Sequence, residues 1–66
     1  MMQGGEELTV PGPVEVRGED GWEPGRVEQR EGKGFWVELE RRGREGFRIV
    51  RLVQRADLRP VGQEAA

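Results

Sequence analysis

Apolar residues recur at every second position along several short stretches of this chain. Val14 and Val16 are separated by one residue, and so are Phe35, Val37 and Leu39. Alternation with a period of two is typical of strands that bury one face of a sheet. Glycine and proline interrupt the alternation at short intervals, which is typical of tight turns. The pattern therefore predicts an all-β chain of short strands.

Five strands and one helical turn are expected. Strands are predicted over residues 13–17, 26–30, 35–40, 47–54 and 59–61, with turns over 19–21, 32–34 and 42–46. Residues 56–58 predict a short 3-10 turn before the last strand, and glycine and proline are too dense for a longer helix. This arrangement predicts a small SH3-like barrel over residues 10–61. A flexible lead-in is expected over residues 1–9 and a flexible tail over 62–66.

The register of the first long hairpin can be predicted from parity, because directly paired residues of an antiparallel sheet face the same side. A three-residue turn at 32–34 pairs Val27 with Leu39 and Gln29 with Val37. The apolar members of both pairs then share the inner face. A two-residue turn would place Val27 opposite a glutamate, so we expect the three-residue turn.

The second hairpin is expected to keep the same face inward. The expected pairs are Leu39 with Phe47 and Val37 with Ile49. This register puts Glu38 beside Arg48 and leaves Trp36 on the outer face between Arg30 and Val50. An exposed tryptophan often dominates an interface, so these three residues form a candidate contact surface. An Arg–Trp stack that only covers the sheet is the alternative.

The other aromatic residues are expected to serve the fold. Phe35 and Phe47 are predicted to lie in the core. Trp22 stands at a predicted turn close to Pro24, where its ring is expected to cover one end of the core. A binding role for the Trp22 ring is the alternative, because tryptophan combines an apolar body with a polar N–H group.

The residue types that the chain lacks exclude most enzyme chemistry. Its 66 residues include no Ser, Cys, His, Tyr or Asn, and Thr9 carries the only aliphatic hydroxyl. A nucleophile beside a base, and a zinc site of the usual kind, both need residues from this missing set. So short a chain also offers no deep cleft for a pair of catalytic carboxylates. We therefore expect no enzyme activity, no metal and no cofactor.

Charge is unevenly distributed along the chain. Residues 1–40 carry four basic and ten acidic side chains, a net charge of −6, whereas residues 41–59 carry seven arginines and two acidic side chains, a net charge of +5. Arg41, Arg42 and Arg44 share one predicted turn and are candidates for contacting phosphates or an acidic protein surface. A solvated turn without a ligand is the alternative.

The source and location of the chain are constrained only by composition. Arginine outnumbers lysine ten to one, a bias expected both of a thermophilic source and of a GC-rich genome. No apolar run approaches the roughly 20 residues that a membrane-spanning helix needs. The N-terminus also lacks the basic-then-apolar order of a signal peptide. We therefore expect a cytoplasmic location and no membrane partner.

Several short motifs together resemble the Tudor and Agenet domains. The motifs are Val14-Glu15-Val16-Arg17, Glu19-Asp20-Gly21-Trp22, Pro24-Gly25-Arg26-Val27, Phe35-Trp36-Val37 and Asp57-Leu58-Arg59-Pro60, within residues 12–61. The resemblance implies a barrel which, in family members with an aromatic cage, binds methylated lysine or arginine. The cage positions would fall at Arg17, Glu23, Glu40 and Arg42, none of which is aromatic. The resemblance therefore implies the barrel without the cage.

Three functions remain open from the sequence. The first is a protein–protein interaction adaptor or regulator that uses Trp36, Val50 and the arginine-rich turn, or an exposed strand edge. The second is a nucleic-acid-binding barrel, with the same arginines on phosphates and Trp22 or Trp36 stacked on bases. The third is a structural subunit that forms homo-oligomers through its strand edges.

Overall fold

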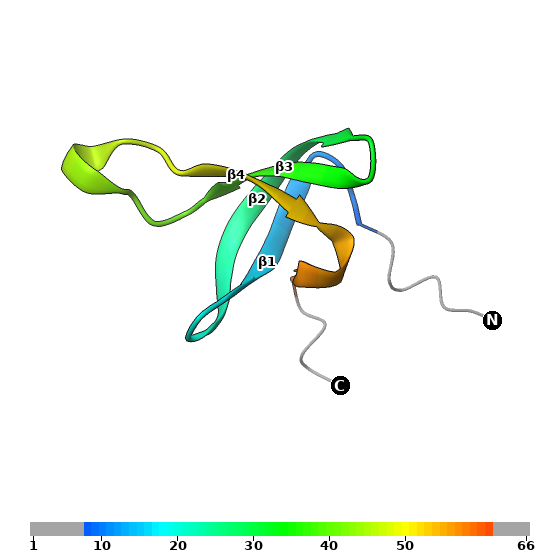
Figure 1. The fold of residues 1–66 in the computed structure, drawn as a ribbon, viewed down its shortest axis with the longest axis horizontal. Coiled ribbons are helices and arrows are strands. Elements are labelled where there is room, and N and C mark those ends of the chain that lie inside the picture. The colour runs from blue at the N-terminus through cyan, green and yellow to red at the C-terminus, as the bar shows by residue number, and fades with distance from the viewer. Residues whose placement is uncertain (1–7, 62–66) are drawn as a thin grey trace.

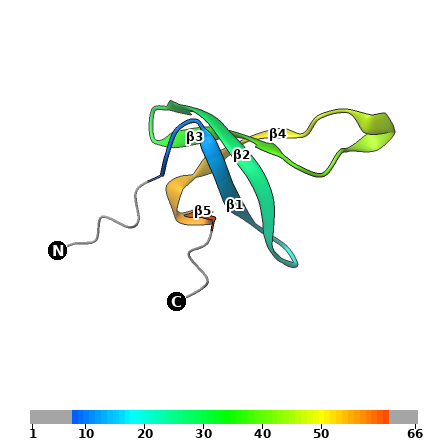
Figure 2. The same cartoon turned by 180° about the vertical axis from the view of Figure 1, so that it is seen from behind.

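One antiparallel five-stranded sheet, in the order β4-β3-β2-β1-β5, organises the chain (Figures 1 and 2). The computed structural model describes residues 8–61. The strands are β1 (Gly12–Gly18), β2 (Gly21–Glu31), β3 (Gly34–Leu39), β4 (Val50–Gln54) and β5 (Leu58–Pro60). The two 3-10 turns are η2 (Arg44–Gly46) and η3 (Arg55–Asp57). The predicted all-β chain with a 3-10 turn before the last strand is confirmed.

The sheet has two edges, β4 and β5, and is not closed into a barrel within residues 8–61. β1 lies between β2 and β5, and η3 makes the connection from β4 to β5. The predicted lead-in and tail lie largely outside the described residues, since nothing is described before residue 8 or after residue 61.

The core lies on one face of the sheet, where inward residues of every strand meet. Its eight buried residues are Val14, Val16, Val27, Phe35, Val37, Leu39, Val53 and Leu58. Alternation accounts for this set, because every second residue of a strand points to the same face. Leu8 and Ile49 are partly buried and pack against the same cluster. Leu8 therefore contacts the core, although the sequence places it in the lead-in.

The turn between β2 and β3 is shorter than predicted. Only Gly32 and Lys33 lie in the turn, and Glu31 pairs directly with Gly34. Gly32 has a φ of 60°, which is the left-handed conformation that two-residue hairpin turns favour. The predicted three-residue turn is therefore wrong.

A β-bulge in β2 keeps the core residues on one face despite the shorter turn. The register shifts between Val27 and Gln29, so that Val27 pairs with Val37 and Gln29 pairs with Trp36. Glu28 is the extra residue of the bulge. It returns Val27 to the inner face, which a two-residue turn without a bulge would not do. The predicted pairs of Val27 with Leu39 and of Gln29 with Val37 are wrong for this reason.

The second hairpin is displaced by two residues from its predicted register. Val37 pairs with Arg51 and Phe35 pairs with Val53, so β4 is shorter than the predicted strand over 47–54. Phe47 is 68% exposed and lies outside the core, which corrects its predicted burial. A shift of two residues keeps every side chain of β4 on the same face of the sheet. Alternation alone therefore does not distinguish the predicted register from the observed one.

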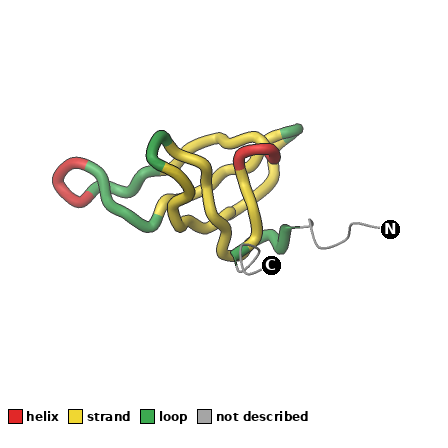
Figure 3. The backbone as a smooth tube through the Cα atoms, turned by 90° about the horizontal axis from the view of Figure 1, so that it is seen from below, coloured by secondary structure: helices red, strands yellow, loops and turns green. Residues whose placement is uncertain are grey.

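Residues 40–48 form a hairpin that projects away from the sheet, and we call this segment the projecting hairpin. Figure 1 shows it in yellow-green, and Figure 3 shows η2 at its far end. The Gly43 N–H donates to the Phe47 carbonyl oxygen (2.8 Å). Glu45 has a φ of 57° and Gly46 a φ of 82°, so the tip turns through two left-handed residues. Phe47 bonds to Gly43 within the hairpin, beyond the last pair with β3, and is therefore exposed.

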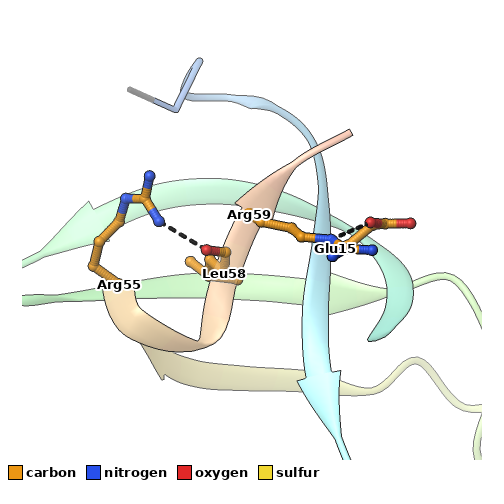
Figure 4. A network of polar contacts seen from close by, with 4 residues as sticks. All are labelled: Glu15, Arg55, Leu58 and Arg59. Atoms are coloured by element: carbon orange, nitrogen blue, oxygen red, sulfur yellow. Dashed lines mark hydrogen bonds and ion pairs between the residues drawn. The ribbon is translucent and has the colours of Figure 1, made fainter. Parts of the chain in front are cut away.

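β5 is joined to β1 by side-chain contacts as well as by pairing. Arg55 Nη1 donates to the Leu58 carbonyl oxygen (2.7 Å), and Arg59 Nε donates to Glu15 Oε1 (2.6 Å) (Figure 4). The Arg59 guanidinium also lies 4.4 Å from the centre of the Trp22 ring. The short strand β5 is therefore held to the sheet by a cluster on its outer face.

Trp22 belongs to this outer cluster. It lies within β2, where it pairs with Arg17, whose guanidinium is 5.2 Å from the centre of the ring. Arg17 also forms an ion pair with Asp57 (3.4 Å). Trp22 is half-buried under arginine and is not a member of the core cluster. The predicted cover over one end of the core is therefore replaced by an Arg–Trp cluster on the opposite face.

Candidate functional site

An apolar stripe crosses the outer face of β3 and β4. Trp36 pairs directly with Leu52, and Val50 pairs with the next outer residue of β3, Glu38. Leu52 is 55% exposed and Val50 is 48% exposed, while Trp36 is half-buried. Val50 and Trp36 are diagonal neighbours on one face, a spacing that a large side chain can bridge. We call Trp36, Val50 and Leu52 the outer stripe.

Leu52 is the member that sequence reasoning missed. The parity that places Val50 on the outer face also places Leu52 there, but the predicted register set Val50 and not Leu52 beside Trp36. Leu52 also lies over Gly34, because a Cβ atom added at Gly34 would be 3.1 Å from Leu52 Cδ1. The missing side chain at Gly34 therefore makes room for Leu52 next to the Trp36 ring.

The Trp36 ring is held by a polar contact at the end of β2. Trp36 Nε1 donates to Glu31 Oε1 at 2.5 Å. Gln29 is the direct neighbour of Trp36 on β2, whereas Arg30 pairs with Phe35 and lies 6.0 Å from the centre of that ring. The predicted placement of Trp36 between Arg30 and Val50 is therefore wrong in both of its neighbours, although its outer position is confirmed.

Two arginines of the projecting hairpin are neutralised by acidic residues of the sheet. Arg41 Nε lies 2.6 Å from Glu23 Oε1, and Arg48 Nη1 lies 3.5 Å from Glu38 Oε1. The predicted contact of Glu38 with Arg48 is thus confirmed, although Val50 is the residue that pairs with Glu38. These ion pairs fasten the base of the hairpin to β2 and β3.

Arg42 and Arg44 have no ion pair within residues 8–61 and lie on the exposed part of the hairpin. Phe47 is exposed on the same segment. The three arginines predicted to share one turn are therefore divided, because Arg41 contacts the sheet and the other two are available to solvent.

Arg51 is a further cation without an ion pair in the described part of the chain. It pairs with Val37 and so lies on the inner face of the edge strand. With Arg41 it lines a hollow of about 540 Å³, which Glu19 and Asp20 of the β1–β2 turn also line. The hollow is wide and charged with both signs.

The charged side chains that line this hollow are carboxylates and guanidinium groups. Over residues 8–61, no group of three or more potential ligands is placed to hold a metal ion. Nor does that part of the chain contain a helix of the length and hydropathy needed to span a membrane.

The structure brings some predicted site residues together and separates others. Trp36 and Val50 share the outer stripe, whereas Trp22 lies under two arginines on the outer face of β1, β2 and β5. Arg30 lies away from Trp36. Comparisons with protein-family models, curated proteins and solved structures return no match for this chain. The outer stripe and its surroundings are therefore the candidate functional site.

Proposed function

We propose that this chain is a non-catalytic binding module that recognises another protein through the outer stripe. One observation carries the proposal. Trp36, Val50 and Leu52 share one outer face, beside an open edge of the described sheet. Exposed apolar surface of this kind on a small domain is typical of interaction sites, and tryptophan is enriched where binding energy concentrates.

The proposed scaffold is a small SH3-like barrel of the Tudor and Agenet type that has lost the aromatic cage. The strand order β4-β3-β2-β1-β5 and the 3-10 turn before β5 support this proposal. The residues at the cage positions are charged, so the proposed module does not bind a methylated side chain through that site. Its binding surface is the outer face of β3 and β4.

A protein partner fits the surroundings of the stripe better than a nucleic acid does. The Glu31 carboxylate accepts a hydrogen bond from the Trp36 ring, where it would repel a phosphate backbone stacked over the ring. The Trp22 ring is covered by Arg17 and Arg59 and offers less surface to a base. Nucleic-acid binding through Arg42 and Arg44 is the competing outcome of the test.

The proposal is tested by selecting binders from a library of random displayed peptides. The wild-type chain is expected to enrich peptides that no longer bind the double variant Val50→Thr/Leu52→Thr. The matched control is Val61→Thr, because Val61 is 56% exposed and lies after β5, away from the stripe. Threonine is β-branched and favours strands, so the sheet is retained in the variants.

Three results would contradict the proposal. The first is enrichment of peptides that bind the double variant as well as the wild type. The second is tight binding of a random oligonucleotide pool that weakens steeply between about 50 and 200 mM salt. The third is a molecular mass that doubles with concentration in sedimentation equilibrium, which would favour self-association.

A further inference from the structure

We infer that the partner binds as an added strand along β4, and that its segment alternates apolar and acidic residues. The inference rests on the proposed function, because it specifies how a protein would occupy the outer stripe. In strand addition, main-chain hydrogen bonds supply affinity and alternate side chains supply specificity. Both elements are present at β4.

Within residues 8–61, the backbone of β4 presents unpaired groups to the open edge at alternate residues. The Leu39 N–H donates to the Ile49 carbonyl oxygen (2.8 Å), so these residues form a hydrogen-bonded pair. Hydrogen-bonded and non-hydrogen-bonded pairs alternate along an antiparallel ladder. The N–H groups of Val50, Leu52 and Gln54 therefore point away from β3, toward the position of a sixth strand.

The two edges of the sheet differ in how well they are protected. β5 pairs over three residues and ends at Pro60, and both short length and proline discourage strand addition. β4 has five residues and contains no proline, glycine or lysine, and its pairing with β3 has no bulge. The accessible edge of the described sheet is therefore β4, which runs directly beside the outer stripe.

Side chains on the two faces of β4 define the sequence that an added strand needs. Val50 and Leu52 lie on the outer face, where they favour apolar residues of the incoming segment. Arg51 lies between them on the inner face and has no acidic partner in the described structure. An acidic residue opposite Arg51 would pair with it, and opposite charges across strands are stabilising. The segment that fits has an acidic residue opposite Arg51, between two apolar residues.

Charge also distinguishes an acidic partner from a second copy of this chain. Residues 41–59 carry a net charge of +5. Antiparallel pairing of two β4 strands about Arg51 or Leu52 would bring the two Arg51 side chains to direct or diagonal positions on one face. Like charges at such positions are destabilising. An acidic segment of another protein is therefore the occupant that the edge favours.

The decisive variant is Gln54→Pro, because it blocks the edge without altering the outer stripe. Gln54 has a φ of −81°, close to the value that proline requires, and its N–H is not needed by β3. The probe is a synthetic peptide of alternating valine and glutamate, about six residues long, which is the usual length of a strand. The control variant is Gln54→Ala, which keeps the outward N–H group.

The peptide is expected to bind the wild type and Gln54→Ala equally, and to bind Gln54→Pro about tenfold more weakly or worse. One main-chain hydrogen bond accounts for a change of about tenfold, to which the clash of the proline ring adds. A peptide of alternating valine and lysine is expected not to bind. Equal binding of the lysine peptide would overturn the acidic preference.

Amide hydrogen exchange followed by NMR gives a second measurement on the wild-type chain alone. In the free protein, the amides of Arg51 and Val53 should exchange slowly and those of Val50, Leu52 and Gln54 rapidly. The peptide is expected to slow the second group. Binding without this change would overturn strand addition, and so would full binding by Gln54→Pro.

These results are separable from the outcome of the proposed function. Binding that survives in Gln54→Pro but is lost in Val50→Thr/Leu52→Thr would refute strand addition and leave the outer stripe as the site. Binding that survives in both variants would refute both proposals. A dimer that dissociates in Gln54→Pro would identify the occupant of the edge as a second copy and overturn the acidic partner.

Discussion

Replacing Arg59 with methionine should destabilise the sheet measurably, because this one side chain joins β5 to both β1 and β2. Arg59 Nε donates to Glu15 Oε1 at 2.6 Å, and its guanidinium stacks at 4.4 Å from the Trp22 ring centre. Both members of the ion pair are largely buried, with side-chain exposures of 28% and 23%. Methionine keeps most of the apolar stem and removes the charge.

The magnitude follows from the two interactions that are lost. A partly exposed cation–π contact contributes about 0.5–1 kcal/mol. The charge-assisted hydrogen bond contributes roughly another 0.5–1 kcal/mol once solvent screening is allowed for. The expected loss is about 1–2 kcal/mol of unfolding free energy. In a domain of this size each kcal/mol lowers Tm by roughly 4–8 °C.

Thermal and urea unfolding, followed by circular dichroism, would measure the loss. A double-mutant cycle of Arg59→Met with Trp22→Leu isolates the stacking contribution, with an expected coupling of about 0.5–1 kcal/mol. The control is Arg26→Met, whose ion pair with Glu28 is long and exposed, so a change within about 0.5 kcal/mol is expected. Strict additivity in the cycle would refute the stacking argument.

Three further substitutions test the core and the backbone. Val37→Ala removes buried methyl groups and should cost about 2 kcal/mol in urea unfolding, whereas Val61→Ala should change stability by less than about 0.5 kcal/mol; similar losses would contradict the assigned core. Gly25→Ala would place a Cβ atom 3.0 Å from the Glu38 carbonyl oxygen and should cost about 1–3 kcal/mol, so an unchanged midpoint would argue against this close approach. Glu45→Asn should raise stability by about 0.5–1 kcal/mol, because asparagine tolerates a φ of 57° better than glutamate does; a lower Tm would count against the left-handed turn.

Alternation was sufficient to predict which face of each strand is buried, but not how the strands pair. Val27 and Val37 were both expected to point inward, and both are fully buried. Their direct pairing was not predictable, because a two-residue turn combined with the bulge at Glu28 points the same side chains inward as a three-residue turn does. A glutamate in a charged stretch gives no local sign that it is the extra residue of a bulge.

The same ambiguity limited prediction of the site. The outer position of Trp36 and its association with Val50 were predictable from alternation, whereas its direct contact with Leu52 depended on the register. Phe47 is predicted to lie in the core because it is aromatic and stands two positions from Ile49, on the same predicted inner face. It is exposed because the pairing with β3 begins only at Ile49, two residues after Phe47. Parity describes a residue only where the strand continues.

The projecting hairpin makes this small protein suitable for carrying a foreign sequence. The hairpin leaves and rejoins the sheet at the hydrogen bond between Leu39 and Ile49, and none of residues 40–48 belongs to the core cluster. The loop-closure entropy depends only weakly on the length of such a loop. An epitope or a protease site could therefore replace the tip around η2 while the eight core residues remain in place.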